Sequence, residues 1–178
     1  TQTNVPVSLL RGIQTGNGTL LQAMVGDIMR NIPLGFAHHK TAMPCYTLDL
    51  AMEELDRYEE DAELLGQLDA GYFQIGTLGG GNHFIELQEG DDGLLSVMLH
   101  SGSRHFGKSV CDYFHHKARE LNARWHSQVP DDYRLAFLPV DSAEGKRYLS
   151  WMQLSMDFAK ENREKMMLAV KAILEKWI

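Results

Sequence analysis

The chain has few cysteines, few basic residues and no long apolar run, and each shortage excludes a class of protein. Its 178 residues include two cysteines, Cys45 and Cys111, which are too few for a disulfide framework and do not form a CxxC pair. A reducing, cytoplasmic setting is therefore expected. No stretch approaches the roughly 18 apolar residues of a membrane helix, so we expect no membrane contact. The first residues show no secretory signal.

Basic residues are outnumbered by acidic ones. The chain has 17 Lys and Arg against 24 Asp and Glu, which gives a net charge of −7 at pH 7. Modules that bind nucleic acid more often carry a basic surplus, so any such contact is expected to be a local patch on an acidic body. Seven acids lie between Glu53 and Glu63. We interpret this run as the solvated face of a helix.

The rest of the composition is that of an ordinary globular protein. Hydrophobic residues make up 44% of the chain and charged residues 23%, which excludes a disordered tail or a collagen-like repeat. No internal repeat or linker divides the sequence, so residues 1–178 are predicted to form a single domain.

Apolar periodicity predicts four helices. The first covers Thr19–Asn31. Between Thr47 and Leu68, apolar residues recur at spacings of three and four, which favours one helix packed on its own core over a coiled-coil seam. The third helix covers Phe106–Trp125, and the fourth begins near Ser142 and continues toward the end of the chain.

One residue of the fourth helix does not fit its pattern. Arg163 falls on the apolar line, where Leu or Met would be expected. Either the guanidinium is buried and has a polar partner, because an unpaired buried charge is costly, or the side chain reaches past the helix edge to water. The predicted line consists of Leu149, Met152, Met156, Ala159, Arg163, Met166, Val170, Ile173 and Trp177.

Two short apolar runs predict an antiparallel hairpin. Phe84–Leu87 and Leu94–Leu99 enclose a spacer rich in turn-forming residues. Together with the helices, this pair indicates an α+β fold, with an antiparallel hairpin or sheet flanked by amphipathic helices. The first eighteen residues lack a sustained period and are expected to be extended or loop.

The first segment with chemical potential precedes this hairpin. Residues 76–86 read Gly-Thr-Leu-Gly-Gly-Gly-Asn-His-Phe-Ile-Glu, and consecutive glycines let a backbone approach a ligand closely. Because the segment leads into a strand and not from a strand into a helix, it is neither a Rossmann fingerprint nor a P-loop. On an ideal strand Asn82, Phe84 and Glu86 share one face and His83 faces the other way. A single site that uses all of them requires irregular backbone at His83.

The second segment follows the hairpin. The second strand ends in His100, and Ser-Gly-Ser-Arg then turns into the third helix. Free backbone N–H groups and a partial positive charge lie at such a helix start. Ser101 and Ser103 are candidate caps, and Arg104 adds a guanidinium suited to phosphate. The sequence therefore predicts an anion site at this turn.

The hairpin brings two histidines together. His83 precedes one strand and His100 ends its partner, so the two imidazoles are expected to lie side by side, as half of a transition-metal site. Spacing alone also allows two ordinary core histidines. A Ser–His hydrolase is less well supported, since no third residue orients the base and no GxSxG elbow is present. A metallohydrolase using His83, His100 and Glu86 has no motif of its own.

At these two segments the sequence resembles the RtcB family of RNA ligases. Gly-Thr-Leu-Gly-Gly-Gly-Asn-His-Phe-Ile-Glu and Leu-His-Ser-Gly-Ser-Arg are similar to two signature blocks of that family, in the same order. Asn162-Arg163 followed by Met166 resembles a third, weaker block. The resemblance extends from about Val25 to the end of the chain.

The resemblance implies a ligase that depends on GTP and manganese. Such enzymes join RNA ends bearing a 3′-phosphate or 2′,3′-cyclic phosphate to a 5′-hydroxyl, as in tRNA splicing and RNA repair, through a guanylylated histidine. Carried over by position, His83 and His100 are expected metal ligands, and Arg104 is expected to meet RNA or phosphate. The implied nucleotide-binding stretch is Asn82, His83, Phe84, Ile85 and Glu86.

The sequence also departs from the family pattern. The Asp-x-x-Cys pair is missing, since Ala42 stands three residues before Cys45. The downstream His-Asn block and the C-terminal histidine that carries the guanylate are missing too, and His105 stands where the family usually has glycine. Family members are more than twice as long, so the chain is expected to be an internal piece.

Two functions remain open from the sequence. The chain is either a portion of an RNA ligase that a longer or complementing chain completes, or an RtcB-like binding and interaction module without catalysis. Apolar surface left where other segments pack would favour self-association in both cases.

Overall fold

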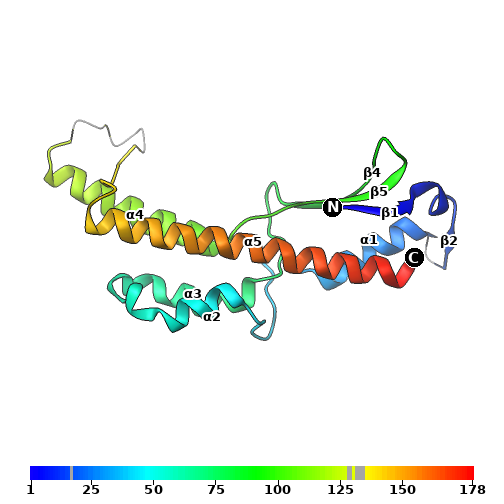
Figure 1. Ribbon diagram of the computed structural model, residues 1–178, viewed down its shortest axis with the longest axis horizontal. Helices are drawn as coiled ribbons and strands as arrows, with labels where there is room; N and C mark the ends of the chain where they lie inside the picture. The colour runs from blue at the N-terminus through cyan, green and yellow to red at the C-terminus, as the bar shows by residue number, and fades with distance from the viewer. Residues whose placement is uncertain (17, 128–129, 131–134) are drawn as a thin grey trace.

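The computed structural model describes residues 1–16, 18–127, 130 and 135–178. They form the α+β fold expected from the sequence, built around one long helix (Figure 1). No helix in these ranges is long and apolar enough to cross a membrane. The elements are β1 (Gln2–Pro6), β2 (Gln14–Thr15), β3 (Gly18–Thr19), α1 (Leu20–Asn31), α2 (Tyr46–Glu53), α3 (Ala62–Gln74), β4 (Phe84–Glu89), β5 (Leu94–His100), α4 (Arg104–Arg124) and α5 (Ala143–Trp177), with 3-10 turns at Val7–Leu9, Leu55–Arg57 and Glu59–Asp61.

The predicted hairpin is confirmed and gains a third strand. β4 and β5 pair antiparallel, and Phe84 lies opposite His100 at the open end of the ladder. β1 pairs with the other side of β5, which gives the order β1-β5-β4. β1 lies within the first eighteen residues, where extended structure was one of the two expectations.

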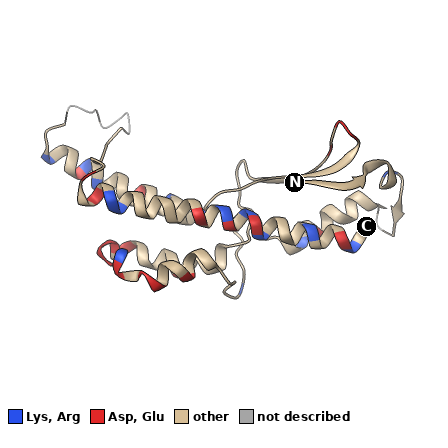
Figure 2. Ribbon diagram, in the orientation of Figure 1, with Lys and Arg blue, Asp and Glu red and all other residues tan. Residues whose placement is uncertain are grey.

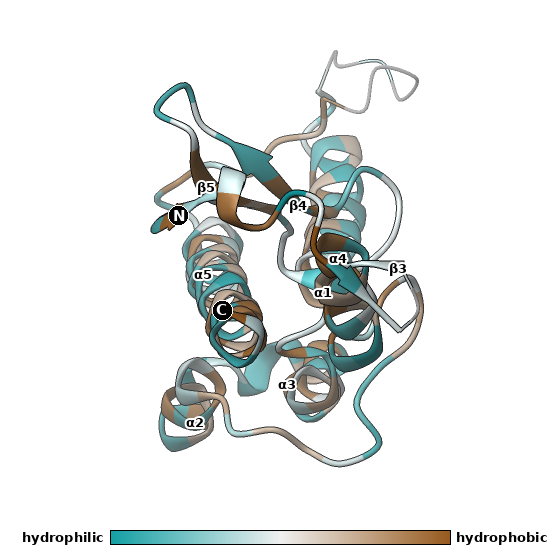
Figure 3. Cartoon of the chain, turned by 90° about the vertical axis from the view of Figure 1, so that its right-hand side faces the viewer, coloured by the Kyte–Doolittle hydropathy of each residue, from teal (hydrophilic) through white to brown (hydrophobic). Residues whose placement is uncertain are grey.

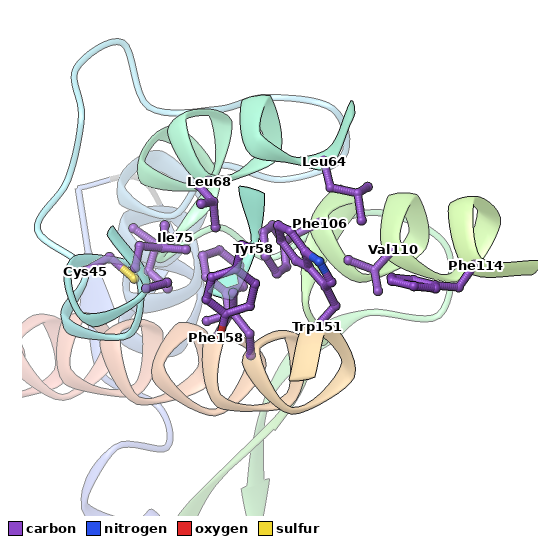
Figure 4. Close-up of a cluster of buried hydrophobic side chains, with 13 residues drawn as sticks. Cys45, Tyr58, Leu64, Leu68, Ile75, Phe106, Val110, Phe114, Trp151 and Phe158 are labelled. Carbon is purple, nitrogen blue, oxygen red and sulfur yellow. The ribbon is translucent and has the colours of Figure 1, made fainter. Parts of the chain in front are cut away.

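Helix α5 links two apolar clusters. Its first half packs with α2, α3 and α4, where Phe106, Trp151 and Phe158 are fully buried (Figure 4). Its second half packs beneath the sheet and beside α1, where Met24, Val97 and Val170 are buried. Viewed along α5, the sheet lies on one side of the helix and α2 and α3 lie on the other (Figure 3).

The helix predicted between Thr47 and Leu68 is not continuous. α2 ends at Glu53, two 3-10 turns follow, and α3 begins at Ala62. Like charges three and four residues apart disfavour a helix through this acidic run. Six of its seven acids are exposed, but Asp61 is fully buried and accepts hydrogen bonds from Tyr113 Oη (2.8 Å) and Trp151 Nε1 (3.0 Å). The interpretation as a solvated face is therefore wrong for Asp61.

The buried line of α5 differs from the predicted one in its first half. Leu149 and Met156 are exposed, whereas Met166 and Val170 are buried as predicted. The row of buried residues shifts around the helix because its two halves pack against different elements. The fully packed positions are Gly145, Trp151, Leu154, Ser155, Phe158, Asn162, Met166, Val170 and Leu174.

Candidate metal and nucleotide site

The two histidines lie side by side, as the hairpin predicts. The ring centroids of His83 and His100 are 5.8 Å apart, with the ring planes at 60°. Phe84 stacks on His100 with centroids 5.8 Å apart, and Asn82 Nδ2 lies 3.4 Å from His100 Nε2. β4 begins only at Phe84, so His83 belongs to the preceding loop and strand alternation does not govern it. This placement supplies the irregular backbone that a shared site requires.

His83 is held in its neutral form by its surroundings. Burial lowers its pKa below the usual value, and the positive charges of Arg104 and protonated His100 lower it further, against a small opposing effect of the Leu78 backbone. Its Nδ1 is buried and makes no hydrogen bond of normal geometry. A neutral imidazole is the form that binds a transition metal. Because Nδ1 is enclosed by protein, Nε2 is the nitrogen left for a ligand.

Gly79 allows this close packing. Its φ of +99° is one that other residues rarely adopt. A Cβ at this position would lie 1.9 Å from Arg104 Nη1 and 2.3 Å from His83 Nδ1. Glycine is therefore required here both by backbone conformation and by space.

Arg104 joins three segments of the chain. It is half-buried, with a φ of +58°, and begins α4. Its Nε donates to Thr77 Oγ1 (2.8 Å) and its Nη2 donates to the carbonyl of Gly35 (2.9 Å). Part of the guanidinium predicted to meet phosphate is thus used within the protein, which fixes its position beside His83.

The prediction that Ser101 and Ser103 cap α4 is wrong. Ser103 is the N-cap residue, but its side chain makes no capping hydrogen bond. Ser101 is buried, and its hydroxyl donates to the carbonyl of Leu78 (2.7 Å). The hydroxyl of Ser101 instead connects the loop before α4 to the loop of residues 76–83.

The most connected residue of the site was missed by sequence reasoning. Asn162 is fully buried on α5, and its Oδ1 accepts from the N–H groups of Gly76 (2.7 Å) and Thr77 (3.2 Å). Its Nδ2 donates to Thr77 O (3.1 Å), Ser101 Oγ (3.3 Å) and Gly102 O (3.1 Å). One amide therefore holds both the loop that contains His83 and the loop that directly follows His100.

Arg163 occupies a different position from the one its pattern suggested. It is partly buried beside the apolar line, and its Nη1 donates to the carbonyl of Ser101 (3.2 Å). The buried line contains two polar residues, Ser155 and Asn162, and Asn162 is the neighbour of Arg163. The signal that could have identified it is the third sequence block, which begins at Asn162.

The predicted nucleotide-binding residues do not all share one face. Asn82, Phe84 and Glu86 are exposed, whereas Ile85 packs against the apolar cluster beneath the sheet. Glu86 accepts from Gln88 Nε2 (2.9 Å). Within the described ranges, no group of three or more His, Cys, Asp or Glu side chains is placed to hold a metal ion. Glu86 thus does not complete the metallohydrolase triad considered from the sequence.

Three of the segments around the site contain no carboxylates, whereas β4 and α5, which also contribute to it, carry Glu86 and Glu161. Residues 28–48, 70–85 and 93–111 include no Asp or Glu, although the chain has 24. Of their basic residues, Arg30 and Lys108 form ion pairs with Asp27 and Asp112 just outside these ranges, whereas Lys40 and Arg104 have no such pair among the described residues. Acids concentrate at the β4–β5 turn and near the outer end of α2 and α3, and others lie along α5 (Figure 2). A polyanion that reached these three segments would meet Lys40 and Arg104 and no carboxylate of the same segments.

Comparisons with known proteins point to one family. The profile described as tRNA-splicing ligase RtcB matches residues 12–178. The chain is 35% identical over 184 residues to the tRNA-splicing ligase RtcB of Pyrococcus abyssi, with 81% of this chain and 20% of that protein covered. It is 32% identical over 200 residues to the one of Methanopyrus kandleri, with the same coverage. The RNA-splicing ligase RtcB of Mycobacterium tuberculosis is 30% identical over 143 residues, with 67% and 33% covered. The chain thus spans about a fifth to a third of these curated relatives.

Proposed function

The chain belongs to the RtcB family, and on that premise we propose that it supplies part of the centre of an RNA ligase. The reaction is the joining of RNA 3′-phosphate or 2′,3′-cyclic phosphate ends to 5′-hydroxyl ends with GTP and Mn²⁺. The observation that carries the proposal is the pair of imidazoles 5.8 Å apart, with His83 neutral and fixed by the loop that contains Gly79. We further propose that residues 1–178 form one domain and act in the cytoplasm.

The two histidines fit a manganese ion as partial ligands. His83 Nε2 and the exposed ring of His100 would hold it, and the ion would supply Lewis-acid stabilisation of phosphate oxygens. Sites of this kind normally take three or four protein ligands. Among the described residues no third His, Cys, Asp or Glu side chain joins them, so binding by this chain is expected to be weak.

The chain's own residues have separate tasks in this proposal. Asn82, Phe84 and Glu86 line the exposed face next to His100 and would contact the guanine nucleotide. Arg104 keeps a positive charge beside His83, where it would balance the negative charge of a phosphate. The surrounding loops carry no carboxylate that would repel RNA.

Mn²⁺ titration followed by NMR tests the half-site. Mn²⁺ is paramagnetic, so even weak binding broadens the ring signals of its ligands. We expect the signals of His83 and His100 to broaden first, and the variants His83→Ala and His100→Ala each to lose this selectivity. His116→Ala, at an exposed site on α4 paired with Glu120, is the control and should leave it unchanged. Equal broadening of all exposed histidines would contradict the proposal.

A second candidate is a non-catalytic RtcB-like module that binds RNA or a complementing chain. It is favoured by the finding that the described residues form no group of three or more candidate ligands. The two functions differ in what a second chain does. Addition of a chain that carries Asp-x-x-Cys and the missing histidines should restore RNA joining in the first case. In the second case the added chain should bind to this one, and no RNA ends should be joined.

A further inference from the structure

Phe36 is more exposed than any other large apolar residue in the described part of the chain. Its relative exposure is 101%. Isolated apolar side chains are common on protein surfaces, so exposure alone identifies nothing. The position of Phe36 in the fold carries the inference.

The turn that presents Phe36 is fixed to the candidate site. The N–H of Gly35 donates to the carbonyl of Gly79 (2.9 Å), and the carbonyl of Gly35 accepts from Arg104 Nη2 (2.9 Å). On either side, Leu78 N–H donates to Pro33 O (2.8 Å) and Ala37 N–H donates to Leu34 O (3.1 Å). The backbone that carries Phe36 is therefore held by the loop that contains His83 and by Arg104, which lies beside His83.

The chemistry around this turn suits a nucleic-acid strand. The turn belongs to the acid-free segment 28–48 and is followed by the exposed side chains of His38 and Lys40. A second exposed aromatic residue, Phe84, stacks on His100 within the same site. Aromatic rings next to positive charge are the usual surface for single-stranded nucleic acid, because every base offers a face for stacking.

We propose that Phe36 is a stacking platform for an unpaired base of the RNA strand whose end reaches the His83–His100 site. This rests on the proposed function, since it takes RNA as the ligand. The hydrogen bonds of the turn fix the backbone that carries the ring, so Phe36 is positioned beside the site before the strand arrives. Stacking would hold the strand without reading its sequence, while Arg104 meets the terminal phosphate.

Fluorescence anisotropy with a labelled 12-nucleotide RNA bearing a 3′-phosphate tests the platform. The variants are Phe36→Ala, Phe36→Leu and Phe36→Tyr, each measured in the whole chain at one salt concentration. We expect Phe36→Ala and Phe36→Leu to weaken binding about fivefold to 150-fold, the range of one base–aromatic stack, and Phe36→Tyr to bind like the parent. Leu9→Ala, at another exposed apolar position, is the control and should have no effect.

RNAs with single abasic positions locate the stacked base. If Phe36 stacks on one base, the RNA lacking that base should bind the parent and Phe36→Ala equally. Full binding by Phe36→Leu would show that only an apolar contact is needed and would overturn the proposal. So would unchanged RNA binding together with weaker binding of free GMP, which would assign the ring to the nucleotide. Binding that survives in every Phe36 variant refutes the platform alone, whereas no RNA binding by the parent refutes the proposed function as well.

Discussion

Replacing Asn162 with Ala should destabilise the protein more than any other single amide truncation near the site. The side chain makes five hydrogen bonds to four residues. Because Nδ2 has two hydrogens for its three acceptors, these contacts amount to about four full bonds, and at about 1 kcal/mol each their loss costs about 4 kcal/mol. The buried N–H and carbonyl of Thr77 would lose these partners, at about 1–3 kcal/mol per group, which gives a similar figure. We expect a loss of about 4–5 kcal/mol.

Urea unfolding followed by circular dichroism measures this loss. Ser155→Ala is a matched control on the same helix, because Ser155 is buried but makes one hydrogen bond, to Trp151 O (2.8 Å), and should cost about 1 kcal/mol. If Asn162→Ala is too unstable to measure, Ser101→Ala removes one bond to Asn162 and one to Leu78 and should cost about 2 kcal/mol. A loss for Asn162→Ala no larger than that of Ser155→Ala would refute the reasoning.

Two other predictions concern the same loops. Gly79→Ala should cost more than about 2 kcal/mol in urea unfolding, since its Cβ would collide with Arg104 and His83, whereas Gly81→Ala, also at positive φ but in open space, should cost only about 1–2 kcal/mol. His83 has a pKa lowered by burial, so the unfolded chain binds its proton more readily and stability should fall as the pH drops below about 6.5. The variant His83→Gln should show a weaker dependence of unfolding free energy on pH. An NMR titration that places the pKa of His83 above 6.5 in the parent chain would contradict the prediction.

Features set by local pattern could be predicted from the sequence. The first helix begins after Thr19 because Thr19 and Gln22 form a reciprocal capping box. The hairpin follows from two apolar runs and a turn-rich spacer, and its register places Phe84 opposite His100. Once the hairpin is assumed, the neighbouring imidazoles follow from chain geometry alone. The adjacency of His83 and His100 could therefore be predicted before any tertiary contact was known, and their role as metal ligands stays a prediction.

Features set by distant partners could not be predicted in the same way. Asn162 lies about 60 to 86 residues from the groups it binds, and nothing in its own helix marks it as a linker. The apolar spacing points to Arg163 instead, because the predicted apolar line is shifted there by one residue from the buried line of α5. Asp61 is a similar case, since its partners Tyr113 and Trp151 belong to two other helices and six neighbouring acids are exposed.

The location of Asn162 explains why an amide is needed there. Phe158, one turn earlier, packs in the first apolar cluster, and Met166, one turn later, packs in the second. Between the two clusters α5 faces the backbone of the loops at Gly76–Thr77 and Ser101–Gly102, whose N–H and carbonyl groups need partners away from water. An apolar residue would leave them unpaired, and a charged one would match only donors or only acceptors. Asn offers both donors and an acceptor. Its position between the two apolar clusters therefore fixes the loop that contains His83 relative to the loop that follows His100.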